Sequence, residues 1–154
     1  MRIFTRYADA CLWLLGIIFI FSATFKWIGI RSFAMTMEQF CDFLGYSPLK
    51  GHGRILAVLV CSGELLLGIS SFIPRLRWYV RWIFPVVMVY FTCITYLNYI
   101  DRYGQIESCG CFGEVIHLSP EESFWKNVVL LTISLLPLIS NIWGWIKYKR
   151  QLHI

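Results

Sequence analysis

Charged residues are scarce in this chain of 154 residues: Asp, Glu, Lys and Arg together make up 15%, whereas 58% of the residues are hydrophobic. Soluble domains usually contain about 25% charged residues, and a soluble domain of this length could not bury so much apolar surface. The sequence also has no internal repeat, no low-complexity segment and no sign of a second domain. The scarcity of charged residues excludes a soluble globular protein and favours a helical membrane protein.

The chain contains four long segments with few charged residues. They are residues 10–25, 55–73, 82–100 and 128–146. Each is about long enough to cross a hydrocarbon core of about 30 Å at 1.5 Å per helical residue, the first by extending to Ile28. We therefore predict an all-α fold, an integral membrane four-helix bundle that forms a single domain over residues 1–154. Its spans are expected at about 8–28, 55–73, 78–99 and 124–146.

The net charge of +5 comes largely from basic residues that flank the predicted spans, not from a basic patch of the kind that binds nucleic acid. Those in the first, middle and last connections are Arg2, Arg6, Arg75, Arg77, Arg81, Lys147, Lys149 and Arg150. The positive-inside rule then predicts a multi-pass protein of the bacterial inner (plasma) membrane with both termini in the cytoplasm. Its expected partners include the lipid bilayer and exclude nucleic acid. Residues 1–25 also resemble a signal peptide, but the long apolar stretch favours a retained span.

The first outside loop, residues 29–53, is expected to contain a short interfacial helix. Apolar residues recur there at helical spacing: Phe33, Met37, Phe40 and Leu44. Ser32 is a suitable N-cap and Gly45 a suitable stop. Such a helix lies at the membrane surface with its apolar face toward the lipid. Cys41 falls on or beside this face, either as a buried structural thiol or as a redox partner.

Two further connections carry clear patterns. The second and third spans are joined by the very short segment 74–78, which favours antiparallel neighbours. The second outside loop, about residues 101–118, is long for a helix bundle, and long ordered loops are often functional. It ends at Ser119-Pro120-Glu121-Glu122, a capping box that predicts the start of the fourth helix at Pro120.

The strongest candidate site is the run Cys109-Gly110-Cys111 in the second outside loop. Two thiols one residue apart close a disulfide only within a turn, and Gly110 and Gly113 allow such a turn. The constrained bond is easily reduced, which suits thiol–disulfide exchange on the extracytoplasmic side, where disulfides persist. Alternatively, each cysteine bonds another partner, such as Cys41, and only staples the loop.

A metal site is the third interpretation of this loop. His117 and two thiolates could bind copper or zinc, but they supply only three ligands, and no second cysteine pair of metal spacing exists. We therefore predict no metal and no other cofactor. The aromatic residues, 18% of the chain, are compatible with a quinone pocket, but interfacial belts and core packing explain them without one.

Glu64 is the outlier within the second span. A carboxylate at that depth costs about 3 kcal/mol on insertion scales and normally faces the bundle interior or a wet cavity. One face of this helix carries Cys61, Glu64, Gly68 and Ser71. This small and polar stripe is expected to point inward. Glu64 would then handle protons beside a redox site or form a helix–helix hydrogen bond to Tyr90 or Thr92.

Cys61 and Cys93 lie in the second and third spans, roughly 10 Å or less below the outer surface. As a pair they would relay electrons from the loop into the membrane. As separate residues they are ordinary apolar fillers of membrane helices.

Three motifs give the chain a resemblance to known membrane proteins. They are Phe21-Ser22-Ala23-Thr24-Phe25-Lys26, Gly63-Glu64-Leu65-Leu66-Leu67-Gly68 and Cys109-Gly110-Cys111-Phe112-Gly113. With four spans and these motifs, the chain resembles the DoxX-like membrane proteins, and most of all the branch of the methylamine-utilisation protein MauE. The resemblance implies that Lys26 and Glu64 match superfamily positions and that Cys109 and Cys111 are the thiol pair of the branch.

The resemblance further implies a role in maturing a disulfide-rich periplasmic dehydrogenase with a thioredoxin-like companion, and leaves the client open. We therefore predict a membrane-embedded thiol–disulfide relay or maturation factor that uses Cys109 and Cys111 on the extracytoplasmic side. It would work with a thioredoxin-like protein or a disulfide-containing client. The alternative is a non-catalytic membrane anchor or assembly subunit whose cysteines only staple the outer loop.

Overall fold

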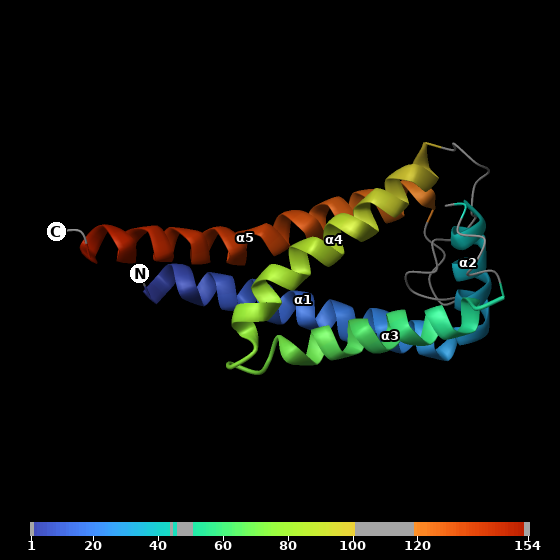
Figure 1. Cartoon of the computed structure of the whole chain (residues 1–154), viewed down its shortest axis with the longest axis horizontal. Coiled ribbons are helices and arrows are strands. Elements are labelled where there is room, and N and C mark those ends of the chain that lie inside the picture. Colours follow the sequence, from blue (N-terminus) through green and yellow to red (C-terminus); the bar gives the residue numbers. More distant parts are fainter. Residues whose placement is uncertain (1, 44, 46–50, 101–118, 153–154) are drawn as a thin grey trace.

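A computed structural model describes residues 2–43, 45, 51–100 and 119–152 of the chain. Within these residues the secondary structure is helical throughout (Figure 1). The helices are α1 (Arg2–Ile28), α2 (Ile30–Phe43), α3 (Gly53–Ser70), α4 (Arg77–Tyr99) and α5 (Pro120–Leu152). The predicted all-α fold with four long spans and one short helix between the first and second spans is confirmed.

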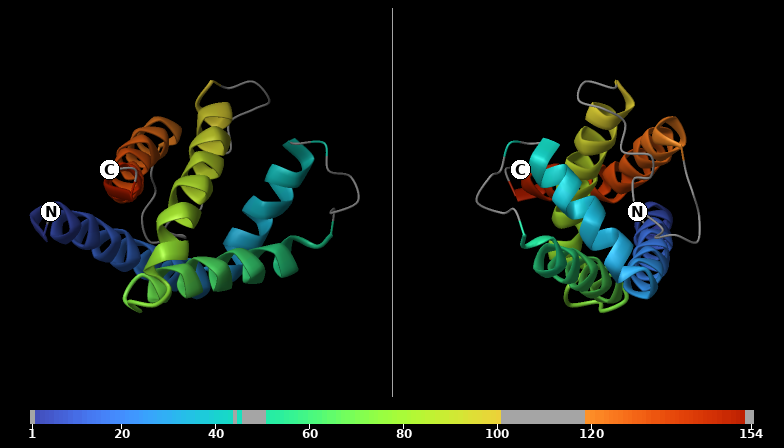
Figure 2. Two further views of the ribbon diagram at one scale, coloured as in Figure 1. Left: turned by 60° about the vertical axis from the view of Figure 1, so that its left-hand side comes forward. Right: turned by 90° about the vertical axis from the view of Figure 1, so that its right-hand side faces the viewer.

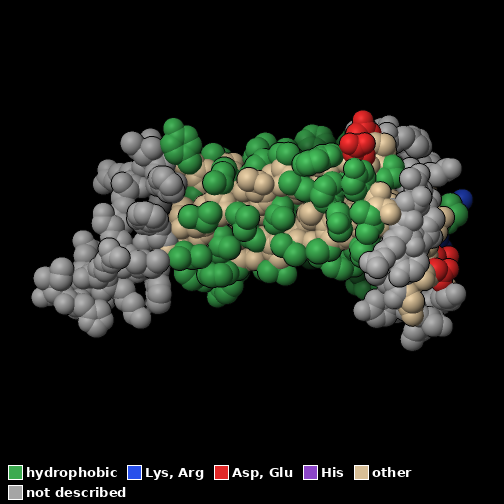
Figure 3. Space-filling model, turned by 90° about the horizontal axis from the view of Figure 1, so that it is seen from above, with side chains coloured by type: hydrophobic (Ala, Val, Ile, Leu, Met, Phe, Trp, Pro, Cys, Tyr) green, Lys and Arg blue, Asp and Glu red, His purple; other side chains and the backbone are tan. Residues whose placement is uncertain are grey.

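The helices that are long and apolar enough to cross a membrane agree closely with the predicted spans. They cover Tyr7–Ile28, Gly53–Ser70, Arg77–Tyr99 and Pro120–Ser140. Figure 3 shows hydrophobic side chains over the middle of the visible face, while acidic and basic side chains gather at the end near α2. This apolar girdle identifies a multi-pass membrane protein that is embedded in the lipid bilayer.

The long helices do not pack in chain order. α1 packs against both α3 and α5, and α4 packs mainly against α5, whereas α3 and α4 touch only slightly. The two diverge from their short connection, as Figures 1 and 2 show. The prediction that these two spans are antiparallel neighbours is therefore wrong along most of their length. The short connection keeps the adjoining ends of α3 and α4 together, but the packing of α3 on α1 and of α4 on α5 sets the directions of the two helices.

Small residues explain why α3 follows α1. A Cβ atom added to Gly68 would lie 2.8 Å from Cγ1 of Ile20 and 2.9 Å from the carbonyl oxygen of Gly16. Backbones that approach this closely need residues without large side chains at the crossing. Ser71 completes the contact, fully buried, with its Oγ donating a hydrogen bond of 2.7 Å to the carbonyl of Gly68. The predicted inward stripe of α3 is confirmed, because Cys61, Glu64, Gly68 and Ser71 are all buried.

Two apolar clusters hold the bundle together. The larger joins α1, α4 and α5 and consists of Leu12, Leu15, Phe19, Val80, Phe84, Met88 and Leu130. Within it the rings of Phe19 and Phe84 meet edge to face, with their centroids 4.9 Å apart. The smaller joins α2 to α3 and consists of Phe33, Ala34, Ala57 and Cys61. The interfacial helix is thus seated on the second span through an apolar face.

The short helix α2 begins earlier than the sequence suggested. Helix α1 runs almost directly into it, since Gly29 N–H donates to the carbonyl of Phe25 and Phe33 N–H donates to the carbonyl of Gly29. Ser32 lies inside the helix, where its carbonyl accepts a hydrogen bond from the Thr36 hydroxyl, so its assignment as N-cap is wrong. Gly45 follows the helix with φ of 71°, the left-handed conformation that favours glycine, and the predicted stop is confirmed.

The capping box at the start of α5 is confirmed in detail. The backbone N–H of Ser119 donates to Oε2 of Glu122 at 2.8 Å, and the backbone N–H of Glu122 donates to Oγ of Ser119 at 3.2 Å. This reciprocal pair satisfies N–H groups that the first helical turn leaves without partners. The helix therefore begins at Pro120, at the same end of the bundle as α2 (Figure 1).

Candidate functional site

An ion pair between Lys26 of α1 and Glu64 of α3 lies inside the bundle. Lys26 Nζ is 2.5 Å from Glu64 Oε1, and the two side chains are only 2% and 6% exposed. A single charge in this environment would cost several kcal/mol, whereas two opposite charges in contact neutralise each other. Charged side chains within membrane spans are rare and commonly mark functional positions.

Neighbouring side chains complete the surroundings of this pair. The hydroxyl of Ser22, one turn before Lys26, lies 3.5 Å from the second carboxylate oxygen, Oε2, and donates to it. The ammonium group of Lys26 also lies 5.1 Å from the ring centroid of Phe33 and 5.4 Å from that of Phe91. These cation–π contacts bring α2 and α4 to the same ammonium group. Lys26 therefore links α1 to three other helices.

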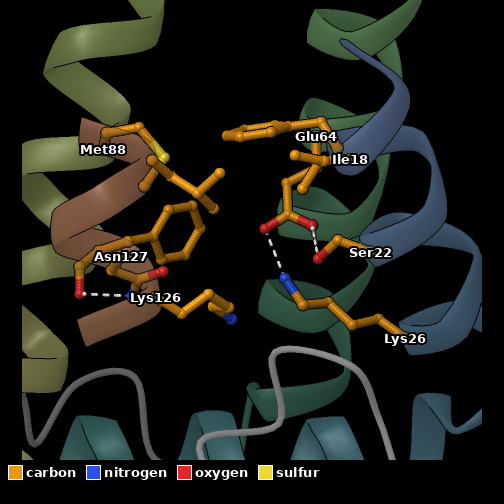
Figure 4. A pocket seen from close by; sticks show the side chains of 10 residues that line it. Ile18, Ser22, Lys26, Glu64, Met88, Lys126 and Asn127 are labelled. Atoms are coloured by element: carbon orange, nitrogen blue, oxygen red, sulfur yellow. Dashed lines mark hydrogen bonds and ion pairs between the residues drawn. The ribbon is translucent and has the colours of Figure 1, made fainter. Parts of the chain in front are cut away.

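The pair borders a cavity of about 30 Å³. Its lining residues are Ile18, Phe19, Ser22, Lys26, Glu64, Met88, Phe91, Lys126, Asn127 and Leu130. In Figure 4, Lys126 reaches into this space from α5 on the side opposite Lys26 and Glu64. The volume has room for about two water molecules, and the polar groups around it supply both donors and acceptors. The site therefore has room for water, and the polar side chains around it would be the hydrogen-bond partners of that water.

Asn127 forms the α4–α5 side of the site. Its amide nitrogen donates to Oγ1 of Thr95 at 3.2 Å and to the carbonyl of Phe91 at 3.4 Å. Hydrogen bonds of this kind between buried side chains hold membrane helices together. The wall opposite the ion pair is thus tied to the bundle by polar contacts as well as by packing.

The family model described as methylamine utilisation protein MauE matches residues 4–140. The chain belongs to the MauE family. The match takes in all four spans and the loop with the thiol pair, and it confirms the predicted resemblance. No curated protein and no solved structure matches this MauE-family chain.

The cysteines of the MauE-family chain fall into two groups. Cys109, Cys111 and the neighbouring His117 lie outside the described residues. The described cysteines, Cys11, Cys41, Cys61 and Cys93, are free thiols. Among the described residues, no group of histidine, cysteine and acidic side chains has an arrangement that could hold a metal ion.

The structure does not bring Cys61 and Cys93 together as a pair. Cys61 is fully buried in the cluster between α2 and α3, and Cys93 is exposed on α4, a helix that α3 barely touches. Cys41 is buried on α2, on the apolar side as predicted. Burial, followed by the nearby carboxylates of Asp42 and Glu38, raises the pKa of the Cys41 thiol. Because the thiolate is the nucleophile, Cys41 has the character of a structural thiol.

Lys26 and Glu64 were both predicted as site residues, but their pairing was not. Tyr90 or Thr92 was the predicted partner of Glu64, and the structure adds contacts of the carboxylate with Lys26 and Ser22 of α1. The Thr92 hydroxyl donates instead to the carbonyl of Met88 in its own helix. Two opposite charges in neighbouring spans were the signal that could have predicted the pair, since each needs a buried counter-charge.

Lys126 and Asn127 were missed as parts of the site. Lys126 follows the start of α5 by less than two turns, so by position alone it resembles a surface base at the membrane boundary. Only the packing of α5 against α1 and α4 turns this part of the helix toward the cavity.

Proposed function

We propose that this MauE-family protein is a membrane-embedded thiol–disulfide relay or maturation factor whose reactive groups are Cys109 and Cys111. A thiolate of the partner attacks one sulfur of the Cys109–Cys111 disulfide, and a mixed disulfide forms as the other cysteine leaves as a thiolate. The partner's second thiolate then releases the reduced pair. The exchange moves two electrons and two protons from a dithiol to a disulfide and runs in either direction.

The partner is a thioredoxin-like protein or a disulfide-containing client on the extracytoplasmic side. This assignment rests on the family and on charge distribution. The start of α1, the end of α5 and the α3–α4 connection lie at one end of the bundle (Figure 1), and the basic residues of the sequence are concentrated in these segments. The positive-inside rule favours the cytoplasm for that end. The thiol pair then lies where disulfides persist.

The main structural support for the proposal is the buried Lys26–Glu64 ion pair. The loop with the thiols connects the end of α4 to the start of α5, and Lys126 and Asn127 follow that start closely. Disulfide exchange consumes and releases protons at thiols, and a carboxylate that borders a cavity with room for water could take part in that proton transfer. We assign Glu64 the role of exchanging these protons through the cavity, with Lys26 holding its carboxylate in place.

The proposal is tested by trapping the mixed disulfide in cells. In the Cys111→Ser variant, Cys109 can still form a mixed disulfide with the partner, but Cys111 is no longer there to resolve it. A covalent adduct should therefore accumulate on non-reducing gels and disappear with reductant. Cys93→Ser is the matched control, because it removes a free thiol from a span and should trap nothing. Mass spectrometry of the adduct identifies the partner.

Two outcomes would contradict the relay. The first is the absence of any adduct with either Cys109→Ser or Cys111→Ser, together with full function of the double variant. The second is a pair that stays fully oxidised in cells lacking other redox proteins, which supports a stapled loop on a membrane anchor. A pair that shifts between reduced and oxidised states with the redox background supports the relay.

A further inference from the structure

A second charged cluster lies at the opposite end of the bundle from Lys26 and Glu64. Asp9 of α1 faces the first two turns of α4, where Arg77 Nη1 lies 3.3 Å from Asp9 Oδ2 and Arg81 Nη2 lies 3.0 Å from Asp9 Oδ1. Two guanidinium groups therefore share one carboxylate. The cluster keeps an excess of one positive charge in a region that borders the membrane.

The two guanidinium groups are only partly satisfied. Each carries five N–H donors in a rigid fork, and Asp9 accepts from one terminal nitrogen of each. The Nε atoms of Arg77 and Arg81 are buried and have no hydrogen-bond partner among the described residues. The side chains are still 19% and 17% exposed, so part of each group faces the surroundings. The buried Nε atoms are out of reach of an acceptor outside the bundle, so such an acceptor would bind the terminal nitrogens of the two guanidinium groups, of which Asp9 engages one in each.

The depth of the cluster in the membrane limits what that acceptor is. Helix α4 has 23 residues and is about 35 Å long at 1.5 Å per residue, slightly more than the hydrocarbon core of about 30 Å. Its first residue, Arg77, therefore lies at the level of the lipid headgroups, and Arg81 one turn deeper. Trp13, Trp78 and Trp82 are each roughly half exposed nearby, as in the aromatic belt of membrane proteins. The guanidinium group of Arg77 lies 5.4 Å from the Trp13 ring centroid.

We propose that Arg77 and Arg81 bind the phosphate group of an anionic phospholipid in this leaflet. The planar fork of arginine matches phosphate oxygens better than any other side chain. A single net negative charge on the lipid balances the excess charge of the cluster, whereas a zwitterionic lipid brings a cation of its own. The exposed tryptophans lie where the glycerol and the upper acyl chains of such a lipid would run. The proposal is independent of the thiol chemistry and of which face of the membrane this end occupies.

The experiment measures lipid retention and thermal stability of the full chain purified in detergent. Phosphatidylglycerol should remain bound in native mass spectrometry and raise Tm, while phosphatidylcholine and inorganic phosphate should do neither. Arg77→Gln and Arg81→Gln should each weaken phosphatidylglycerol binding about tenfold, as for one lost charge-assisted hydrogen bond. Arg75→Gln is the matched control: it removes the same charge from an exposed position on the α3–α4 connection and should leave binding unchanged.

Each alternative outcome overturns the proposal. An equal loss of binding in Arg75→Gln would mean diffuse charge attraction. An equal rise in Tm with inorganic phosphate would mean that the site binds the free anion. An equal rise with phosphatidylcholine would mean that binding does not depend on the net charge of the lipid. If the glutamine variants do not fold, Arg77→Lys and Arg81→Lys keep the charge but lose the fork. They should reduce lipid retention while Tm without added lipid stays the same, and unchanged retention in both lysine variants would contradict the site.

Discussion

At the scale of single residues, Lys26 and Glu64 form a buried ion pair between α1 and α3. Each makes the other tolerable, because a charge left alone in a buried, apolar site costs far more than a pair in contact. The pair is not required for burial as such, since hydrophobic residues of similar size would fill the same space at no greater cost. A buried pair kept in a membrane span is therefore better explained by function than by stability.

This view predicts a strongly non-additive response to mutation. Lys26→Met or Glu64→Gln alone should each lower the free energy of unfolding by about 3–5 kcal/mol, because one charge stays buried without its partner. The double variant Lys26→Met/Glu64→Gln should recover much of that loss. Thermal unfolding in detergent, arranged as a double-mutant cycle, measures the coupling.

Ser22→Ala is the control for this cycle. It removes the longer hydrogen bond to Glu64 without removing a charge and should cost about 1 kcal/mol. If the costs of the two single variants simply add in the double variant, Lys26 and Glu64 do not act as a pair.

At the scale of secondary-structure elements, the contact between α1 and α3 determines the shape of the bundle. The glycines of α3 play two different roles in it. A Cβ atom at Gly68 meets α1 at once, whereas a Cβ atom at Gly63 would have no neighbour within 4 Å. Gly68 therefore serves helix packing, whereas Gly63 has no packing role among the residues that the structure describes.

The two positions form a matched pair of substitutions in one helix. Gly68→Ala should destabilise the bundle by about 1–3 kcal/mol, because the added methyl group forces α1 and α3 apart. Gly63→Ala should leave stability unchanged or raise it by up to about 1 kcal/mol, since alanine favours the helix. Tm values of both variants in the same detergent provide the measurement, and an equal effect at both positions would refute the close crossing.

At the scale of the whole molecule, two charged clusters mark the two ends of the bundle. Lys26, Glu64 and Lys126 lie toward the end with α2, and the Asp9–Arg77–Arg81 cluster lies toward the end with the α3–α4 connection. Since the basic connections are concentrated at the second end, we expect that end to face the cytoplasm.

This orientation is tested by labelling in intact spheroplasts. After reduction, a membrane-impermeant maleimide should label Cys109 or Cys111, and the Cys109→Ser/Cys111→Ser variant should lose that label. A tag placed after Ile154 should stay protected from external protease. If labelling requires disruption of the membrane, the loop with Cys109 and Cys111 faces the cytoplasm, and the proposed extracytoplasmic relay is wrong.

Local patterns in the sequence were enough to predict most elements. Apolar length located the four spans, because the thickness of the hydrocarbon core requires about 20 residues of helix. The reciprocal hydrogen bonds between Ser119 and Glu122 followed from their spacing, and Gly45 from its conformational freedom. The start of α2 was missed because Gly29 continues the hydrogen bonding of α1 into α2, so no separate cap is needed there.

The sequence by itself determined the membrane class, the spans and the inward face of α3. Each of these depends on residues close together in the chain. Only the tertiary structure decided that Lys26 meets Glu64, that Lys126 borders their cavity and that α3 leaves α4 for α1. These outcomes depend on which helices can approach most closely and on the burial of charge, and both are set by contacts between distant segments.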